Sequence, residues 1–313
     1  MRTPLPSTSP TEAPSWPYCA HGADPVTDPV GCRGIHVTGS TACLAHLNDV
    51  DRTTYLAGLA PGAGIDHRGT PFTGDLLDQL LTAVTDPATR DPHISTARFD
   101  GAKFSGIAAF HIAQFSGDAR FNGAKFSGDA WFDGAQFTGT AAFNSVEFSG
   151  TAGFSDAQFS GDAGFDSAQF FGDVWFIGAE FSGGITWFNS AKFFGTTWFN
   201  NAQFSGDAAF NSAKFSGDVW FNSAQFLMSA RWGPLVCAGR VDLSGAVFGA
   251  PVTLEIAASA VQCTRTRWES TATVRVRRAK VDLGYAVLAA PVAVTAHPTP
   301  FAHVEGASWT RAR

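Results

Sequence analysis

The chain has 313 residues and a formal net charge of −6, which gives it no general attraction for nucleic acid or for an anionic membrane surface. No stretch of it approaches the roughly 20 consecutive apolar residues that a membrane-spanning helix needs. The composition is skewed, with 29 Phe and 33 Gly against 3 Tyr and 2 Met, and such skew is typical of internal repeats.

The first segment, residues 1–15, is rich in Pro, Ser and Thr and contains no apolar run. It therefore lacks a recognisable secretory signal peptide, and we expect a disordered tail there. The chain has 5 Cys, an odd number, and no export signal accompanies them. We therefore expect a reduced, cytoplasmic setting and no membrane partner.

Residues 16–94 differ from the rest of the chain and predict a small helical segment. One helix is expected to begin at Ser40 and to run towards Leu59. A second is expected from Gly74 to Val84, because leucines recur there at helical spacing. We interpret these two helices as a cap that closes the N-terminal end of the repeats that follow.

The same segment holds the one group of side chains in the sequence that resembles a metal site. Cysteine and histidine are the usual zinc ligands, and four of them could stabilise a small segment that lacks a core of its own. Only Cys43 and His46 are closely spaced, so a structural zinc site and a set of separate thiols both remain open. The candidate ligands are Cys19, Cys32, Cys43 and His46, with His21 as a spare. No other cofactor is expected.

From Phe99 onward, phenylalanine recurs at alternating intervals of five and six residues. Two positions before nearly every such Phe stands Ala, as in Ala113-Gln114-Phe115. In an extended segment, positions i and i−2 lie on one face, so Ala and Phe should point inward and the residue between them outward. Ser-Gly, Asn-Ser and Asp-Gly pairs follow the phenylalanines and supply the corners.

The outward residues indicate how many of these units make one coil. Lys103 and Lys125 belong to a row that returns every 22 residues and, after a one-residue insertion near Gly183 and Gly184, includes Lys214. The row half a coil away is mostly Gln. A coil half as long again would mix the Lys row with the Gln row. Each coil should therefore have four sides, with successive coils about 4.8 Å apart.

Beyond Phe226 the pattern continues, but its period shortens to 20 residues, as the inward Val241, Val261 and Val281 indicate. Here the segment Val241-Asp242-Leu243-Ser244-Gly245 resembles the unit of the pentapeptide-repeat family, Ala-(Asp/Asn)-Leu-x-x, with Val in place of Ala. The Phe-rich units are similar, with Phe at the centre and one extra residue in alternate units.

The resemblance to pentapeptide-repeat proteins covers residues 95–298 and leaves a short tail at 299–313. It implies an all-β solenoid, and more specifically a right-handed quadrilateral β-helix, with about 22 and then 20 residues in each coil. Because each coil of such a fold contacts only its neighbours, both ends need a cover.

The most informative predicted surface is a row of outward tryptophans. Trp175, Trp198 and Trp220 should stack on three successive coils, with Trp131 two coils away from Trp175. Exposed apolar strips often mark interaction sites, and Trp is favoured at binding hot spots. The same rings could instead stabilise the sheet by packing on one another. Both interpretations remain open.

The sequence contains no nucleophile elbow, phosphate-binding Gly loop or paired carboxylates in a pocket, so we do not expect an enzyme. We expect a structural scaffold that mediates protein–protein interaction through the faces or ends of the solenoid, with a protein partner whose identity is open. The resemblance also implies a homodimer formed through a solenoid end as a further arrangement.

Two alternatives concern nucleic acid. Some pentapeptide-repeat proteins imitate DNA and bind DNA gyrase or topoisomerase, which requires vertical rows of carboxylates. In this chain Thr interrupts the acidic corner rows, and the outward rows are Lys, Gln, Trp and Arg. Direct binding by the basic C-terminal coils, between Arg265 and Lys280, is the second alternative, and the negative net charge opposes it.

Overall fold

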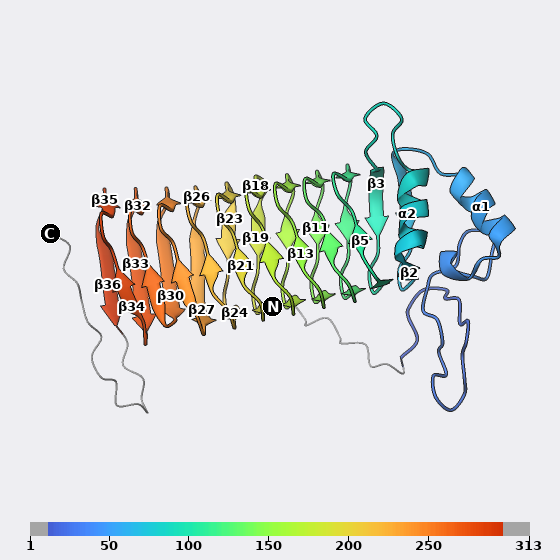
Figure 1. Ribbon diagram of the computed structural model, residues 1–313, viewed down its shortest axis with the longest axis horizontal. Coiled ribbons are helices and arrows are strands. Elements are labelled where there is room, and N and C mark those ends of the chain that lie inside the picture. The colour runs from blue at the N-terminus through green and yellow to red at the C-terminus, as the bar shows by residue number, and fades with distance from the viewer. Residues whose placement is uncertain (1–11, 297–313) are drawn as a thin grey trace.

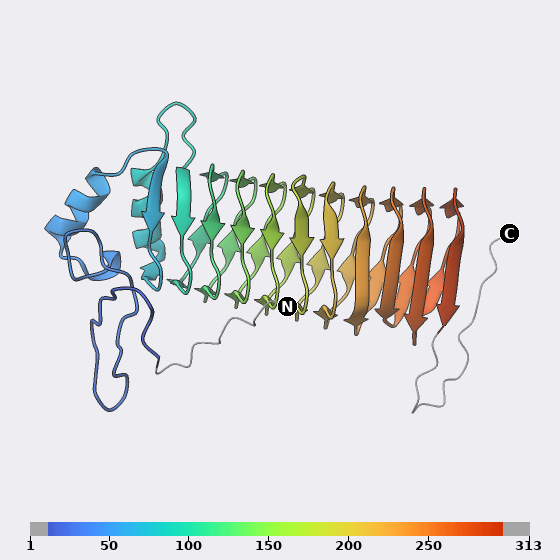
Figure 2. The same cartoon turned by 180° about the vertical axis from the view of Figure 1, so that it is seen from behind.

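The computed structural model describes residues 12–296, which form a rod of stacked coils with helices at its N-terminal end (Figure 1). Figure 2 shows the same stack from behind, with strands from successive coils lying side by side. The expected all-β solenoid is confirmed. The tail expected at 1–15 lies largely outside the described residues, and the tail expected at 299–313 lies entirely outside them.

Each coil has four sides, named A to D here in chain order, and each strand pairs in parallel with its counterparts in the neighbouring coils. Side A consists of β6 (Gln114–Phe115), β10 (Gln136–Phe137), β14 (Gln158–Phe159), β18 (Glu180–Phe181), β22 (Gln203–Phe204), β26 (Gln225–Phe226), β29 (Val247–Phe248), β32 (Arg267–Trp268) and β35 (Val287–Leu288). Side D is a separate nine-stranded sheet. It consists of β5 (Ala108–Ala109), β9 (Ala130–Trp131), β13 (Ala152–Gly153), β17 (Val174–Trp175), β21 (Thr197–Trp198), β25 (Val219–Trp220), β28 (Arg240–Asp242), β31 (Ala260–Gln262) and β34 (Lys280–Asp282).

Sides B and C are separate in the first coils and merge in the last ones. Side B begins as β7 (Ala119–Arg120), β11 (Ala141–Ala142), β15 (Ala163–Gly164), β19 (Ile185–Trp187) and β23 (Asp207–Ala209). Side C begins as β4 (Lys103–Ser105), β8 (Lys125–Phe126), β12 (Glu147–Phe148), β16 (Gln169–Phe170), β20 (Lys192–Phe193) and β24 (Lys214–Phe215). From β27 onward single long strands replace both sides: β27 (Ala230–Cys237), β30 (Val252–Ala257), β33 (Ala272–Arg277) and β36 (Val292–Ala296).

The register of these sheets confirms both predicted periods. Gln136 pairs with Gln114 on one side and with Gln158 on the other, which is the longer of the two periods. Val261 pairs with Val241 and with Val281, which is the shorter one. The change of period therefore takes place inside one continuous stack.

The core consists of phenylalanine columns that run along the rod. Phe143 and Phe165 are fully buried and stack with their ring centroids 5.1 Å apart and their planes 3° from parallel. Phe154 meets Phe143 at 5.5 Å and 86°, so neighbouring columns contact edge to face. Both arrangements suit the charge distribution of aromatic rings, and the stacking distance is set by the spacing of paired strands.

The N-terminal segment supplies the first coil as well as the helices. Strand β1 (Ala63–Asp66) pairs with β3 (His93–Arg98), and β2 (Pro71–Thr73) pairs with β4. Strand β3 in turn pairs with β6 on side A and with β7 on side B. Helix α2 (Gly74–Ala83) follows β2 and buries four leucines against the core, so it closes the end of the stack (Figure 1).

The first expected helix is interrupted. A 3-10 turn, η1 (Leu44–His46), is followed by Leu47 in an extended conformation, and α1 (Asp49–Ala57) begins only after it. Asn48 caps α1, because its side chain accepts a hydrogen bond from the Asp51 amide at 2.9 Å. Within residues 12–296, no helix combines the length and apolar character needed to cross a membrane.

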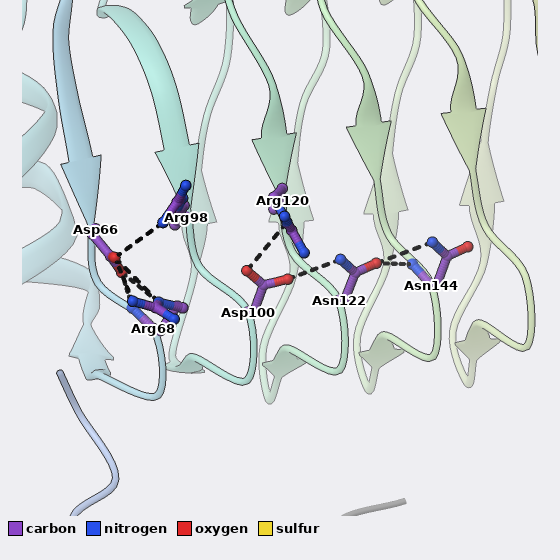
Figure 3. Close-up of polar contacts among 7 residues, drawn as sticks. All are labelled: Asp66, Arg68, Arg98, Asp100, Arg120, Asn122 and Asn144. Carbon is purple, nitrogen blue, oxygen red and sulfur yellow. Dashed lines mark hydrogen bonds and ion pairs between the residues drawn. The ribbon is translucent and has the colours of Figure 1, made fainter. Parts of the chain in front are cut away.

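A polar ladder joins the first coil to the regular coils (Figure 3). At its start, Asp66 accepts hydrogen bonds from Arg68, with 2.8 Å between Oδ2 and Nη2. Arg98, from the next coil, lies 3.8 Å from the same carboxylate. The carboxylate therefore links two coils through two cations.

The ladder continues through amide and carboxylate side chains at one corner of the coil (Figure 3). Asn122 donates from Nδ2 to Asp100 at 2.8 Å, and Asn144 donates to Asn122 at 3.0 Å. Arg120 adds an ion pair to Asp100 at 3.5 Å. Each side chain here satisfies a group in the adjacent coil, which gives the row a structural role.

Candidate functional site

The structure places the predicted tryptophans in one row on the outer face of side D. The strand pairing aligns Trp131, Gly153 and Trp175, followed by Trp198 and Trp220. All four rings are half-buried rather than fully exposed. This row, Trp131, Trp175, Trp198 and Trp220, is called the Trp ridge below.

A glycine lets two rings of the Trp ridge approach across an intervening coil. The rings of Trp131 and Trp175 lie 5.5 Å apart, although their strands are two coils apart. A Cβ on Gly153, which lies between them, would be 2.6 Å from Cε3 of Trp131. Trp131 therefore lies over the backbone of Gly153, and a larger residue there would displace it.

The remaining contacts of the Trp ridge combine aromatic packing with charge. Trp175 meets Trp198 edge to face at 6.4 Å. The guanidinium of Arg240 lies 4.9 Å from the ring centre of Trp220 and 3.8 Å from Asp218 Oδ2. One Trp and one Asp of the same coil thus bind a single arginine by a cation–π contact and an ion pair.

A column of aspartates borders the Trp ridge, two residues before the Trp in the same coil. Asp173 precedes Trp175 and accepts a hydrogen bond from the Thr196 amide at 2.9 Å. Asp129 precedes Trp131 and accepts one from the Thr151 amide at 2.8 Å. Next to each of these two aspartates, the adjacent coil therefore has a threonine. Next to Asp218, the adjacent coil has Arg240 instead.

The sequence analysis missed two exposed phenylalanines next to this surface. Phe171 and Phe194 are 48% and 44% exposed and stack at 4.9 Å, each four residues before a Trp of the ridge. The signal was present in the Phe170-Phe171 and Phe193-Phe194 doublets, because most other coils have Ser at the second position. Their exposure enlarges the apolar surface around the Trp ridge.

Asp66 and His67 are an acid and a base that are adjacent in the chain, but they do not form an open catalytic site. His67 is fully buried at the head of a phenylalanine column, and its Nε2 lies 3.2 Å from the Tyr55 hydroxyl. Burial lowers the pKa of His67 to about 4, and Asp66 opposes this only partly. The imidazole is therefore neutral near pH 7 and belongs to the core.

The basic C-terminal residues do not gather on one face. Arg267 lies on side A beside Glu269, Arg275 lies on the merged strand β33, and Lys280 lies on side D. Arg275 forms an ion pair with Glu255 in the preceding coil. Two of these cations are thus paired within the chain, and the charge is spread around the rod.

The four predicted metal ligands, by contrast, come together. The ligand atoms of Cys19, Cys32, Cys43 and His46 all lie within 4.8 Å of one another. The Sγ atoms of Cys32 and Cys43 are 3.7 Å apart, and Nδ1 of His46 lies 3.4 Å from the Sγ atoms of Cys19 and of Cys43. This group is called the Cys/His cluster below. His21, the expected spare, stacks on the His46 ring at 4.0 Å.

The thiols of the Cys/His cluster differ from those in the core. The hydrogen bond with the Cys43 thiol lowers the pKa of Cys32 to about 5, and the same hydrogen bond raises the pKa of Cys43. In the solenoid, burial raises the pKa of Cys237 to about 11 and that of Cys263 to about 12. The two core thiols are therefore protonated and act as small apolar side chains.

Comparison with known proteins supports the same architecture. A family model described as pentapeptide repeats (9 copies) matches residues 99–146 and 143–192. Neither the curated proteins nor the solved structures gave a match. The matched residues are coils in which inward Ala and Phe alternate with outward polar residues and Trp. Residues 99–192 thus carry pentapeptide repeats, and the coils on either side of them continue the same stack.

Proposed function

We propose that this protein is a non-catalytic scaffold and that the Trp ridge is the surface on which it binds a protein partner. The observation that carries the proposal is the contact between Arg240, Trp220 and Asp218. It is an internal example of how this face binds a cation. The pairs Trp175 with Asp173 and Trp131 with Asp129 repeat the arrangement without an arginine in the adjacent coil.

The chemistry of the Trp ridge and of the bordering aspartates indicates which side chains a partner would present. Half-buried indole rings favour apolar groups, and the bordering carboxylates favour arginine or lysine. A protein segment that combines apolar and basic side chains would satisfy both. The exposed Phe171 and Phe194 would add apolar contact area at the same edge. A cytoplasmic, reducing setting is part of the proposal, since it would keep the five cysteines as thiols.

The test is affinity capture of the partner by the full chain. It compares the wild type with a variant that combines Trp175→Ala, Trp198→Ala and Trp220→Ala. A Trp hot spot contributes about 2 kcal/mol or more, so the loss of even one of the three should weaken partner binding by at least about 30-fold. The matched control changes Gln158, Gln203 and Gln225 to Ala on side A and should bind normally. Equal binding by both variants would place the partner elsewhere.

A second variant tests the charge of the partner. Asp173→Asn keeps the oxygen that accepts from the Thr196 amide but removes the charge, so the coil should fold unchanged. Binding of a basic partner should weaken and become less sensitive to salt. If Asp173→Asn leaves both affinity and salt dependence unchanged, the aspartate column takes no part in recognition.

The C-terminal end is a second candidate surface, for a homodimer. Tyr285, Val287 and Leu288 there are 86%, 56% and 53% exposed. Among the described strands, β34, β35 and β36 each have a paired neighbour on one side alone. Mass measurement by light scattering over a range of concentrations, with Leu288→Lys as the variant, distinguishes a dimer from a monomer.

Binding to DNA gyrase or topoisomerase through DNA mimicry is the remaining alternative, and the geometry favours it less. Asp129, Asp173 and Asp218 lie in every second coil, and each uses one oxygen to accept a backbone amide of the adjacent coil. A continuous phosphate-like row would need a free carboxylate in every coil. Inhibition of gyrase supercoiling by micromolar protein would revive this alternative.

A further inference from the structure

We propose that the Cys/His cluster binds one zinc ion, which fixes the N-terminal segment to the end of the solenoid. The ligands are the Sγ atoms of Cys19, Cys32 and Cys43 and the Nδ1 atom of His46. Three thiolates and one imidazole form one of the usual structural zinc sets. The site is independent of the Trp ridge and of the proposed partner.

Three of the six distances between the ligand atoms match a tetrahedral zinc ion, and the other three lie within 4.8 Å. With Zn–S near 2.3 Å and Zn–N near 2.05 Å, tetrahedral angles place two sulfurs about 3.8 Å apart and a sulfur and nitrogen about 3.6 Å apart. The corresponding distances are 3.7 Å between Cys32 and Cys43, and 3.4 Å between His46 and each of Cys19 and Cys43. A disulfide needs about 2.05 Å between sulfurs, so the Cys32–Cys43 spacing is not that of a disulfide and leaves room for a shared ion.

The contacts of His46 favour one shared cation over separate hydrogen bonds. Its Nδ1 lies equally close to the sulfurs of Cys19 and Cys43, yet a neutral imidazole nitrogen has either one proton or one lone pair. It can therefore make one good hydrogen bond to these two thiols. A metal ion at the centre satisfies the nitrogen and all three sulfurs at once.

The local backbone is built to bring these ligands together. Cys19 and Cys32 lie on paired segments, since the Cys19 amide donates to Gly34 and the Ala20 amide donates to Cys32, both at 2.8 Å. Cys43 and His46 lie on one 3-10 turn, closed by a bond from the His46 amide to the Cys43 carbonyl at 2.9 Å. The hairpin thus supplies two ligands and the turn supplies the other two.

Gly34 shows how closely the two parts approach. A Cβ at Gly34 would lie 2.6 Å from the Cβ of Cys43 and 2.7 Å from its sulfur. The Gly34 amide also points at the Cys32 sulfur, at 3.4 Å. Such an amide donor stabilises a metal-bound thiolate from the second coordination sphere. Only glycine can therefore serve both Cys32 and Cys43 at this position.

The proposed zinc site lies where the N-terminal segment meets the first coil. The Ile35 amide donates to the Arg68 carbonyl at 2.8 Å, and Arg68 lies over the Trp16 ring at 4.9 Å. Leu44 and Leu47 join the hydrophobic core from this segment. With so few buried apolar residues of its own, the segment gains most of its order from the ion and from this contact.

The first experiment measures metal in the full-length protein, purified under reducing conditions and without chelator. We expect about one zinc per chain. After exchange, Co²⁺ should give the visible d–d bands and thiolate charge-transfer absorption of a tetrahedral site with three sulfurs. No zinc and no such Co²⁺ spectrum, or a Cys32–Cys43 disulfide found by mass spectrometry in the reduced preparation, would overturn the proposal.

Variants identify the ligands. Cys19→Ser should reduce zinc affinity at least 10-fold, and Cys43→Ser should do the same. His21→Ala is the matched control, because this ring stacks on His46 without being a ligand, and it should retain zinc. His46→Cys replaces one good ligand by another and should restore a tetrahedral site with a changed Co²⁺ spectrum. Full zinc content in Cys19→Ser and Cys43→Ser would contradict the assignment.

The structural role has its own readout. Removal of zinc by a chelator should open residues 16–47 to proteolysis while leaving the far-UV circular dichroism of the solenoid unchanged. If the segment resists protease equally with and without zinc, the ion does not order it, and the inference about its role is wrong.

Discussion

The solenoid contains two kinds of coil, which differ in how they fill the core and how they turn the corners. The coils up to Phe226 have the longer period, phenylalanine columns and four separate short strands. Those from β28 onward have the shorter period and one long strand in place of two short ones, and the long strands are visible at the orange and red end of Figure 1. Their core is mostly aliphatic, although Phe248 and Trp268 continue the aromatic column on side A. The same rod thus continues across a change of core and of corner geometry.

The merged strands lack the turn between sides B and C, and the first of them, β27, still follows β24 at the longer period. Between sides B and C, the aromatic coils turn through a residue with positive φ, such as Ser167 at 59°. In β30 this turn is absent, and Val252, Leu254 and Ile256 alternate inward along one straight strand. The turn between sides D and A persists in both kinds of coil, for example at Arg265 with φ 58°. In the coils of the shorter period, sides B and C therefore form one straighter wall.

The largest expected effect comes from truncating the cores of the two kinds of coil. Phe165→Ala should destabilise the protein by about 4 kcal/mol and Leu254→Ala by about 3 kcal/mol, because both side chains are fully buried and leave cavities. Denaturant unfolding followed by circular dichroism measures both. Phe165→Leu removes the ring stacking but keeps an apolar side chain. It should lower the unfolding free energy by about 1 kcal/mol more than a volume-neutral exchange would. No loss in Phe165→Leu would mean that the aromatic columns only fill space.

The column that begins at His67 should make stability depend on pH. Its folded pKa of about 4 is below the usual 6.5, so the unfolded chain binds the extra proton more readily. The stabilisation is complete above pH 6.5 and is lost as pH falls towards 4, by up to about 3 kcal/mol. His67→Phe extends the phenylalanine column and should remove this contribution. The prediction fails if wild type and His67→Phe show the same change in unfolding free energy between pH 7 and pH 4.5.

The corner between sides A and B also differs between the two kinds of coil. A Cβ on Gly161 would lie 2.3 Å from the Gly139 carbonyl oxygen, a backbone atom that cannot easily move. Gly161→Ala should therefore cost about 2 kcal/mol. Ala250 takes the corresponding place in a later coil, and Ala250→Gly should cost less than about 1 kcal/mol. Similar melting temperatures for both variants would show that the corners are equivalent.

The smallest effect concerns the corner that both kinds of coil share. Ile112 has φ 52°, a region that β-branched residues rarely adopt, and it is half exposed. Ile112→Asn should raise the unfolding free energy by about 1 kcal/mol, since Asn tolerates this conformation. Arg265→Asn makes the same exchange in a coil of the shorter period and should stabilise by less, because arginine is not β-branched. Destabilisation by Ile112→Asn would show that the Ile side chain contributes more than its backbone strain.

The regular coils were predictable because their information is local and repeated. Spacing alone placed Phe and Ala inside, set both periods and aligned Trp175, Trp198 and Trp220. A strand register that must keep one face buried leaves few alternatives. The sequence therefore determined the position of the Trp ridge as well as the architecture.

The remaining features depend on contacts between segments that no period connects. The first coil, formed by β1 and β2, contains one phenylalanine of the pattern, Phe72, so the repeat did not reveal it. The expected first helix breaks at Leu47, which is extended and buried in the core. The Cys/His cluster depends on a hairpin that closes the wide interval between Cys19 and Cys32. The Arg240 contact joins residues from two different coils.

Because the coils are evenly spaced, side D presents its side chains at regular intervals along the rod. Stacked rings such as Phe176 and Phe199 repeat every 4.8 Å, so two coils advance by about 9.6 Å. Asp129, Asp173 and Asp218 recur at this double interval. A polyproline II segment completes one turn in about 9.3 Å with three residues. A partner in that conformation, running parallel to the rod, would therefore place two side chains three residues apart next to Asp129 and Asp173, whereas Asp218 is already paired with Arg240.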